Sequence, residues 1–333
     1  MPGLSCPASS RATSRNRRQL MIDIVVLFFL FGLAAGLLRS ELKLPAALYE
    51  SLSVVLLLTI GLKGGEGLAR QAVLPLLPQL GAVILLGALQ TLIGFAVLRG
   101  VGRLARADAA AMAAHYGSVS VATFAVGVNW LMNRGIEFEP QMAIFLAVME
   151  VPAIMVGILL ARGIGRQTDW KLLAHETFLG KGVTLLLGGM LIGWIAGPAG
   201  LAPVKSLFFE LFKGVLALFL LEMGLIVSRQ IGELRTRGAF IIGFGLLMPL
   251  FSALLGAACG MMLGLSVGGL TLLITLAASA SYIAAPAAMR MAVPEANPAL
   301  SLAAALGVSF PFNILVGLPL YHALAVRLAG AAP

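Results

Sequence analysis

Residues 52–71 of this chain align without a gap with residues 211–230. The identical pairs are Leu52 and Leu211, Leu57 and Leu216, Leu62 and Leu221, Gly65 and Gly224, Arg70 and Arg229, and Gln71 and Gln230. Two shorter matches follow in the same order at nearly the same spacing: Ser118–Ser120 with Ser279–Ser281, and Glu150–Pro152 with Ser309–Pro311. Three ordered matches indicate an internal repeat, so the chain is expected to fold into two similar halves.

The composition is that of a membrane protein. Hydrophobic residues make up 60% of the chain and charged residues 11%, whereas a soluble domain carries about 25% charge. Apolar runs of the roughly 20 residues needed to cross a bilayer recur along the whole chain. The formal net charge of +9 lies mostly in short loops between these runs, which favours a membrane orientation signal over a nucleic-acid partner. Two cysteines predict no disulfide framework.

The apolar runs predict an all-α polytopic protein with ten transmembrane helices. The predicted spans are Met21–Leu38, Leu44–Leu62, Leu74–Leu98, Ala107–Leu131, Gln141–Ala161, Phe178–Ile195, Ser206–Ser228, Gly238–Leu263, Gly268–Met289 and Ala299–Val326. The first repeat covers residues 21–162, a cytoplasmic linker covers 163–177, and the second repeat covers 178–327. Because five spans per repeat is an odd number, the second repeat enters the membrane with opposite polarity, and the repeats are inverted.

Basic residues set the orientation, since cytoplasmic loops are rich in Lys and Arg. The loops after the odd-numbered spans, with the adjoining helix ends, hold Arg39, Lys43, Arg99, Arg103, Arg106, Arg162, Arg166, Lys171, Lys181, Arg229, Arg235, Arg237 and Arg290. The opposite side holds fewer, which predicts a multi-pass protein of the bacterial inner membrane with both termini outside. Residues 1–20 are polar and read either as a disordered tail or as a mis-assigned start, with Met21 as the true first residue.

The fourth and ninth spans each carry small and polar residues near their middle. Gly117, Ser118 and Ser120 lie in the fourth span, and residues 279–281 lie at the matching place in the ninth. A helix broken there would free backbone N–H groups, which lipid cannot satisfy and a small anion can. The alternative is that small residues only let two helices cross.

Glu150 lies near the middle of the fifth span, where a lone charge costs at least about 2.5–3.5 kcal/mol. Pro152 loosens the helix beside it. The matching residue in the tenth span is Ser309, and Asn313 follows one turn later. Carboxylate, hydroxyl and amide oxygens suit a hard cation such as sodium. The alternatives are a protonated glutamate bonded to a neighbouring helix and a proton carrier.

Lys63, Gly64 and Gly65 lie toward the outer end of the second span, and Glu222 takes the place of Lys63 in the second repeat. A gate and a purely structural role are equally compatible with this pattern. The sequence holds no metal-binding His/Cys spacing, Walker loop or nucleophile–base pair, so we expect neither an enzyme nor an ATP-driven pump. We also expect no cofactor, with sodium acting as a coupling ion.

The chain resembles the sodium-dependent bicarbonate transporters, the low-flux, high-affinity permeases of cyanobacteria, over its whole length from Met21. The similar segments are Ile60–Gly65, Ala114–Ser120, Met149–Pro152, Ala278–Arg290, Pro294–Pro298 and Gly307–Asn313. The resemblance implies a mobile core against a scaffold, a homotrimer in membrane lipid, and inhibition by a cytoplasmic PII-like protein. It assigns bicarbonate to Gly117, Ser118, Ser120, Ser279, Ala280 and Ser281. It assigns sodium to Glu150, Ser309 and Asn313.

The predicted function is therefore sodium-dependent bicarbonate symport by alternating access. The alternatives within transport are a sodium symporter for another small organic anion and a cation/proton antiporter. The antiporter is disfavoured because Glu150 has no acidic neighbour at its depth. A non-transporting membrane sensor or scaffold that binds an anion is the alternative of a different class.

Overall fold

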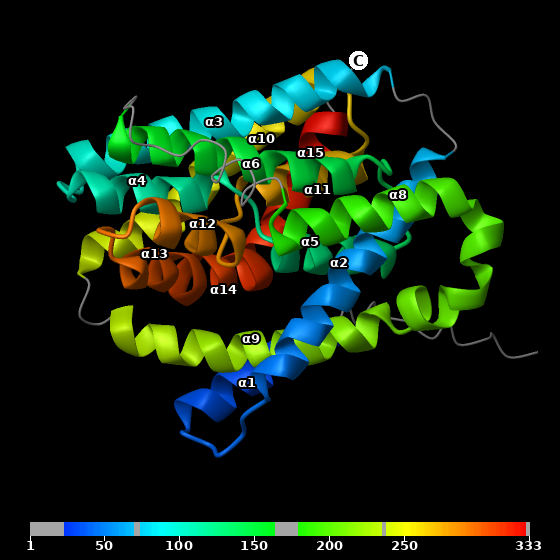
Figure 1. The fold of residues 1–333 in the computed structure, drawn as a ribbon, viewed down its shortest axis with the longest axis horizontal. Helices are drawn as coiled ribbons and strands as arrows, with labels where there is room; N and C mark the ends of the chain where they lie inside the picture. Colours follow the sequence, from blue (N-terminus) through cyan, green and yellow to red (C-terminus); the bar gives the residue numbers. More distant parts are fainter. Residues whose placement is uncertain (1–22, 70–73, 164–178, 235–237, 331–333) are drawn as a thin grey trace, which may run out of the picture.

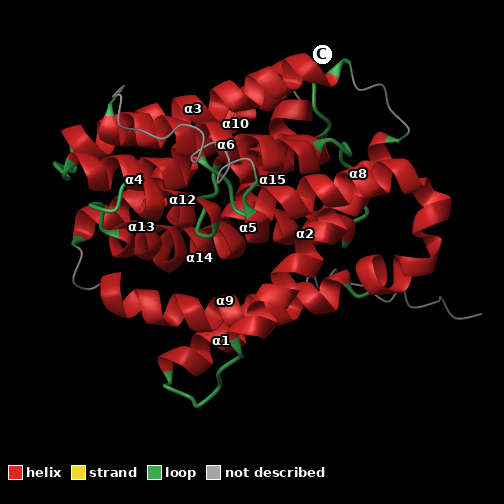
Figure 2. Cartoon of the chain, in the orientation of Figure 1, coloured by secondary structure: helices red, strands yellow, loops and turns green. Residues whose placement is uncertain are grey.

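The structure is a computed structural model, and it describes residues 23–69, 74–163, 179–234 and 238–330. The described part of the chain folds entirely into helices joined by short loops (Figure 2). The predicted tail, residues 1–20, lies outside the described residues, as does the linker 163–177 apart from its first residue. The prediction of an all-α chain is confirmed.

The helices follow the apolar runs closely. The first half holds α1 Ile24–Leu37, α2 Ala46–Leu68, α3 Leu76–Gly100, α4 Arg106–Gly117, α5 Val121–Met132 and α6 Met142–Arg162. The second half holds α8 Lys181–Leu201, η1 Ala202–Val204, η2 Ser206–Glu210, α9 Phe212–Leu234, α10 Ala239–Met262, α11 Val267–Ala277, α12 Ala284–Ala292, α13 Pro298–Ala304, η3 Ala305–Ser309, α14 Phe310–Phe312, η4 Asn313–Gly317 and α15 Leu318–Gly330. Within the described residues, eight helical segments are long and apolar enough to cross a membrane, and Ile24–Leu37 and Val267–Ala277 are shorter apolar helices. The chain is a multi-pass membrane protein.

Three helices continue well beyond the predicted ends of their spans: α2 to Leu68 instead of Leu62, α8 to Leu201 instead of Ile195, and α9 to Leu234 instead of Ser228. The backbone of α8 turns at Gly197, where φ is +58°, and Pro198 follows. Glycine adopts this left-handed conformation without a steric penalty, so the chain changes direction there and continues as a second helical segment.

The helices form two groups (Figure 1). The scaffold layer consists of α1, α2, α8 and α9, in which α1 packs against α9 and α2 against α8. The core bundle consists of α3 to α6 and α10 to α15 with η3 and η4, and in it α3 packs on α4 and α6, and α10 packs on α11. Helices α4 and α5 together form the most completely buried of the long apolar segments, so the centre of the core bundle lies around them.

Glycines set the close crossings within the scaffold layer. A Cβ placed on Gly65 of α2 would collide with the Met190 carbonyl oxygen of α8. Its repeat partner, Gly224 of α9, would in the same way collide with the Phe29 carbonyl oxygen of α1. Small residues at such crossings let helix backbones approach closely in lipid. The repeated glycine therefore has a packing role in both halves.

Gly65→Ala should destabilise the protein by about 1–3 kcal/mol, because the added methyl group overpacks the crossing of α2 and α8. Thermal unfolding in detergent measures the effect. Gly188→Ala is the matched control on α8, because a Cβ there meets nothing within 4 Å. Equal melting temperatures for the two variants would contradict a packing role for Gly65.

Candidate functional site

The first element of the site is the non-helical segment between α4 and α5, residues 118–120, which we call the first interval. Helix α4 ends at Gly117, Ser118 and Ser120 have extended backbones, and α5 starts at Val121. Ser120 caps α5, because its hydroxyl oxygen accepts from Thr123 N at 3.1 Å. Serine is a favoured residue at this position, since its side chain satisfies one of the free N–H groups at the helix start.

Close packing explains why residue 117 is a glycine. A Cβ at this position would collide with the Thr91 hydroxyl oxygen of α3 and would lie 2.7 Å from the Gly87 carbonyl oxygen. A Cβ on Gly87 would in turn lie 3.2 Å from the Gly117 carbonyl oxygen and 3.3 Å from that of Met149. Helices α3, α4 and α6 therefore converge, backbone against backbone, where α4 ends.

The second element is the segment between α11 and α12, residues 278–283, which we call the second interval. The second interval contacts the first. Helix α11 ends at Ala277 and α12 begins at Ala284. Ser120 N donates to the Ser279 hydroxyl at 2.9 Å. Ser281 N donates to the His115 carbonyl oxygen at 2.8 Å, and His115 Nδ1 lies 2.6 Å from the Ser281 carbonyl oxygen. The structure thus brings together the two stretches assigned to the anion, including Ala280, which is buried.

Most of the serine hydroxyls in these intervals already have partners. Ser120 Oγ also donates to the Tyr282 hydroxyl at 3.1 Å, and Ser279 Oγ donates to the Leu276 carbonyl oxygen at 2.7 Å. Ser281 Oγ accepts from a backbone N–H of α12 at 3.2 Å. The Ser118 hydroxyl is buried and has no partner among the described residues. Of these serines, Ser118 is the one whose hydroxyl is available to a ligand.

Ser309 and Asn313 lie on the tenth predicted span, in two π-helical stretches on either side of Pro311. Proline has no N–H to donate, and π-helical turns often occur at functional sites. Ser309 Oγ donates to the Gly245 carbonyl oxygen at 2.6 Å and lies 2.7 Å from the Tyr116 hydroxyl of α4. Ser309 is thereby attached to the helix that ends at the first interval.

Asn313 is attached to the second interval. Its Nδ2 donates to the Ala278 carbonyl oxygen at 2.8 Å, and its Oδ1 accepts from the Tyr321 hydroxyl at 2.7 Å. The side chain therefore fixes the end of α11 against α15. Both atoms of the amide group have partners within the described chain.

Glu150 is buried in α6, with 6% of its surface exposed. A Cβ placed on Gly182 of α8 would lie 3.8 Å from Glu150 Oε2, so the carboxyl group points toward the scaffold layer. Within the described residues, no hydrogen bond joins Glu150 to Ser309 or Asn313. The three residues assigned to sodium therefore fall into two places: Ser309 and Asn313 at the intervals, and Glu150 facing α8.

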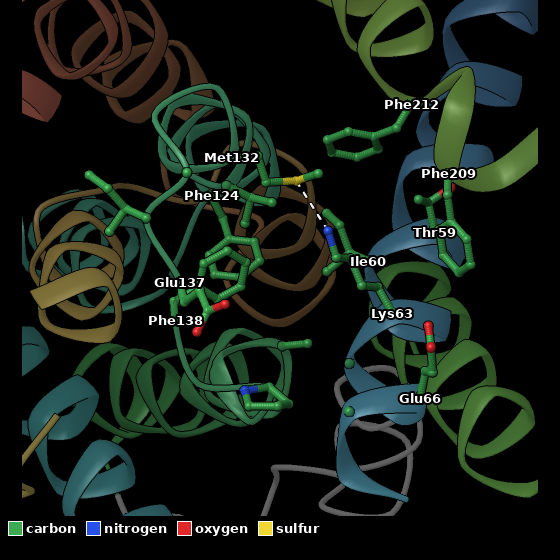
Figure 3. A pocket seen from close by; sticks show the side chains of 17 residues that line it. Thr59, Ile60, Lys63, Glu66, Phe124, Met132, Glu137, Phe138, Phe209 and Phe212 are labelled. Carbon is green, nitrogen blue, oxygen red and sulfur yellow. Dashed lines mark hydrogen bonds between the residues drawn. The ribbon is translucent and has the colours of Figure 1, made fainter. Parts of the chain in front are cut away.

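A cavity of about 720 Å³ lies between the scaffold layer and the core bundle (Figure 3). Its walls come from α2, α5, the loop before α6 and the start of α9. Figure 3 shows Lys63 reaching from α2 toward Met132 of α5, and Lys63 Nζ lies 3.1 Å from Met132 Sδ. Phe124, one turn beyond Ser120 on α5, also lines the cavity. The cavity thus approaches the first interval along α5.

The other residues proposed as a gate or structural element lie in different environments. A Cβ on Gly64 would lie 2.7 Å from Ala143 Cβ, so Gly64 fits α2 against α6. Glu222 is buried in α9, accepts a hydrogen bond from the Leu44 backbone, and keeps Oε2 without a partner among the described residues. Although Lys63 and Glu222 are repeat partners, only Lys63 lines the cavity.

Helix α5 is held at its far end by the scaffold layer. Asp23, which caps α1, accepts from Asn129 Nδ2 at 2.9 Å and from Asn133 Nδ2 at 2.6 Å. Lys213 of α9 donates to Asn133 Oδ1 at 3.2 Å. We call Asp23, Asn129, Asn133 and Lys213 the polar clasp. It joins the scaffold layer to the helix that begins at the first interval.

These features define a class of protein. The helix pairs α4–α5 and α11–α12 meet in a buried bundle, with backbone groups and hydroxyls at the meeting point, and such an arrangement is known from secondary transporters. The profile of the Na+-dependent bicarbonate transporter superfamily matches residues 24–326, and the chain belongs to this family. Family membership confirms the predicted resemblance and implies bicarbonate and sodium as the transported species. No curated protein matches the chain.

His115→Ala should separate the two intervals, because it leaves the buried Ser281 carbonyl oxygen without its side-chain partner at a cost of about 1–3 kcal/mol. Thermal unfolding measures the loss. His115→Asn is the conservative control, because Asn Nδ2 occupies the place of His Nδ1 and can still donate. Equal melting temperatures for the two variants would show that the His115 side chain does not hold the two intervals together.

Proposed function

We propose that the chain is a sodium-dependent bicarbonate symporter of the cell membrane that works by alternating access. The observation that carries the proposal is the meeting of the α4–α5 and α11–α12 intervals, linked by Ser120 N to Ser279 Oγ and by Ser281 N to the His115 carbonyl oxygen. In a chain of this family, these bonds hold the starts of α5 and α12 together, and helix starts supply directed donors for a small anion.

The proposal includes ten spans in two inverted five-helix repeats, with the fourth and ninth spans broken. Eight long apolar segments and two shorter apolar helices among the described residues would together make the ten spans. The helix contacts support the symmetry, since two pairs of contacts correspond when the repeats are exchanged. The contact of α1 with α9 corresponds to that of α2 with α8, and that of α3 with α4 corresponds to that of α10 with α11.

The anion site of the proposal consists of Gly117, Ser118, Ser120, Ser279, Ala280 and Ser281. Helices α5 and α12 begin beside these residues, and each helix start carries a partial positive charge of about half a unit. The free Ser118 hydroxyl adds a donor. An oxyanion at this point would be bound by dipoles and hydroxyls, without a charged side chain.

The proposal assigns sodium, the coupling ion, to Glu150, Ser309 and Asn313, of which Glu150 faces α8 in this structure and, among the described residues, is not bonded to the other two. A cation near the anion favours anion binding, and the anion favours cation binding by the same free energy. One charge crossing 100 mV contributes about 2.3 kcal/mol. A tenfold sodium gradient adds about 1.4 kcal/mol.

Alternating access would move the core bundle against the scaffold layer. The cavity lined by Lys63 and Phe124 would be the outer entrance, given the charge-based orientation with both termini outside. Movement would break the polar clasp and the contact of Lys63 with Met132. The homotrimer and the cytoplasmic PII-like regulator implied by the resemblance belong to the same proposal.

Uptake of radiolabelled bicarbonate into proteoliposomes tests the function. Uptake should require an inward sodium gradient and should stop when potassium replaces sodium. Folded, inserted protein that takes up no bicarbonate in either condition would refute the proposal. A panel of small organic anions in the same vesicles would then distinguish a sodium symporter for another small organic anion from a non-transporting sensor.

Glu150→Gln should abolish the sodium dependence of uptake, because the neutral amide loses the charge that attracts the cation. The measurement is uptake against sodium concentration at fixed bicarbonate. Glu295→Gln, at an exposed position in the loop before α13, controls for loss of one carboxylate. Unchanged sodium activation in Glu150→Gln would remove Glu150 from the proposed sodium-binding residues.

A further inference from the structure

Helix α3 brings a further polar side chain to the meeting point of the two intervals. This residue, Gln90, is not one of the proposed sodium-binding residues. Gln90 lies in the middle of α3, and 1% of its surface is exposed. Its Nε2 donates to the carbonyl oxygen of Ala277 at 2.8 Å. Ala277 is the last residue of α11. Its Oε1 is buried and has no hydrogen-bond partner within the described chain.

The orientation of this amide group follows from its partner. A backbone carbonyl only accepts hydrogen bonds, so the NH2 group of Gln90 donates to Ala277, and Oε1 is the amide atom left without a partner among the described residues. A buried oxygen without a partner costs about 1–3 kcal/mol, and most buried polar atoms in proteins are paired. The free oxygen is therefore suited to a ligand with positive charge or a donated hydrogen.

The surroundings favour a cation. The carbonyl oxygens of Ala277 and Ala278 lie at the C-terminal end of α11, which carries a partial negative charge. Each accepts from a side-chain amide, Gln90 in one case and Asn313 in the other. A carbonyl oxygen has two lone pairs, so each keeps one for a further ligand. Amide and carbonyl oxygens are the ligands that hard cations prefer.

The second repeat carries a similar group at the matching position. Gly94 of α3 packs on Ala113 of α4, and Gly256 of α10 packs on Ala277 of α11. Gln90 lies four residues before Gly94, and Ser252 lies four residues before Gly256. The Ser252 hydroxyl is also buried without a partner among the described residues. A free oxygen at one position of both repeats points to a ligand-related role.

We propose that Gln90 Oε1 and the carbonyl oxygens of Ala277 and Ala278 form a second sodium site. The proposal rests on sodium symport as the function. In this site Gln90, and not Glu150, supplies the side-chain ligand. Two sodium ions entering with one bicarbonate carry one net positive charge, so uptake is driven by the membrane potential as well as by the sodium gradient.

The test measures bicarbonate uptake by full-length protein in proteoliposomes against sodium concentration. Wild-type protein should show a Hill coefficient for sodium near its limit of about 2, the number of sites. Gln90→Leu should lower it to about 1 and raise the sodium half-saturation concentration by about tenfold, which corresponds to about 1.4 kcal/mol. Gln79→Leu is the matched control, since Gln79 lies on the same helix, accepts a hydrogen bond from Gln141 and lies away from the intervals.

A second readout does not depend on flux. Sodium chloride, compared with potassium chloride, should raise the melting temperature of wild-type and Gln79→Leu protein more than that of Gln90→Leu, because a ligand stabilises the state that binds it. Equal sodium stabilisation of Gln90→Leu and wild type, or an unchanged Hill coefficient, would overturn the site and leave Gln90 bonded to water. Absence of sodium-dependent uptake in wild type would instead refute the proposed function, while the melting experiment would still decide whether Gln90 binds sodium.

Discussion

The structure depends on one constraint: backbone groups freed inside a membrane must find partners within the protein. Helices α4 and α11 both stop inside the bundle, and each interval supplies what the other lacks. Ser120 N reaches the Ser279 hydroxyl, and Ser281 N reaches the His115 carbonyl oxygen. Neither interval would be stable alone, so the two halves of the chain must fold against each other. The close approach of α3 to Gly117 seals the same point from a third side.

The two intervals also separate charge without ionised side chains at the centre. Helices α4 and α11 end there with carbonyl groups, and α5 and α12 begin there with N–H groups. The ends attract cations and the starts attract anions, each with about half a charge. A cation and an anion can therefore be bound side by side, and the attraction between them links their affinities. The free Gln90 oxygen lies on the carbonyl side of this arrangement.

Much of the fold could be predicted because long apolar runs and glycine patterns are local signals. Helix α4 ends within the Gly–Ser stretch that the sequence selects, and the repeated pair Gly65 and Gly224 lies at two equivalent crossings. Gln90 was missed because its partner, Ala277, lies 187 residues away and nothing in the apolar sequence around it indicates a contact. The bond between Tyr116 and Ser309 was missed for the same reason. The helical segment beyond Gly197 was missed because Gly197 and Pro198 are residues that normally end a helix, and the predicted span stops before them at Ile195.

The contacts inside the scaffold layer are of a different kind from those between the layer and the core bundle. This difference decides where movement is easiest. Inside the scaffold layer, Gly65 and Gly224 place backbone directly against backbone, and separating those helices would open voids along their length. Between the layer and the core bundle, apolar side chains such as Phe29 and Phe310 pack together. The polar clasp and the contact of Lys63 with Met132 add side-chain interactions at one end of α5. Each such hydrogen bond contributes only about 0.5–1.5 kcal/mol. The clasp is therefore easier to break than the glycine crossings, so movement is expected between the two groups of helices and not within the scaffold layer.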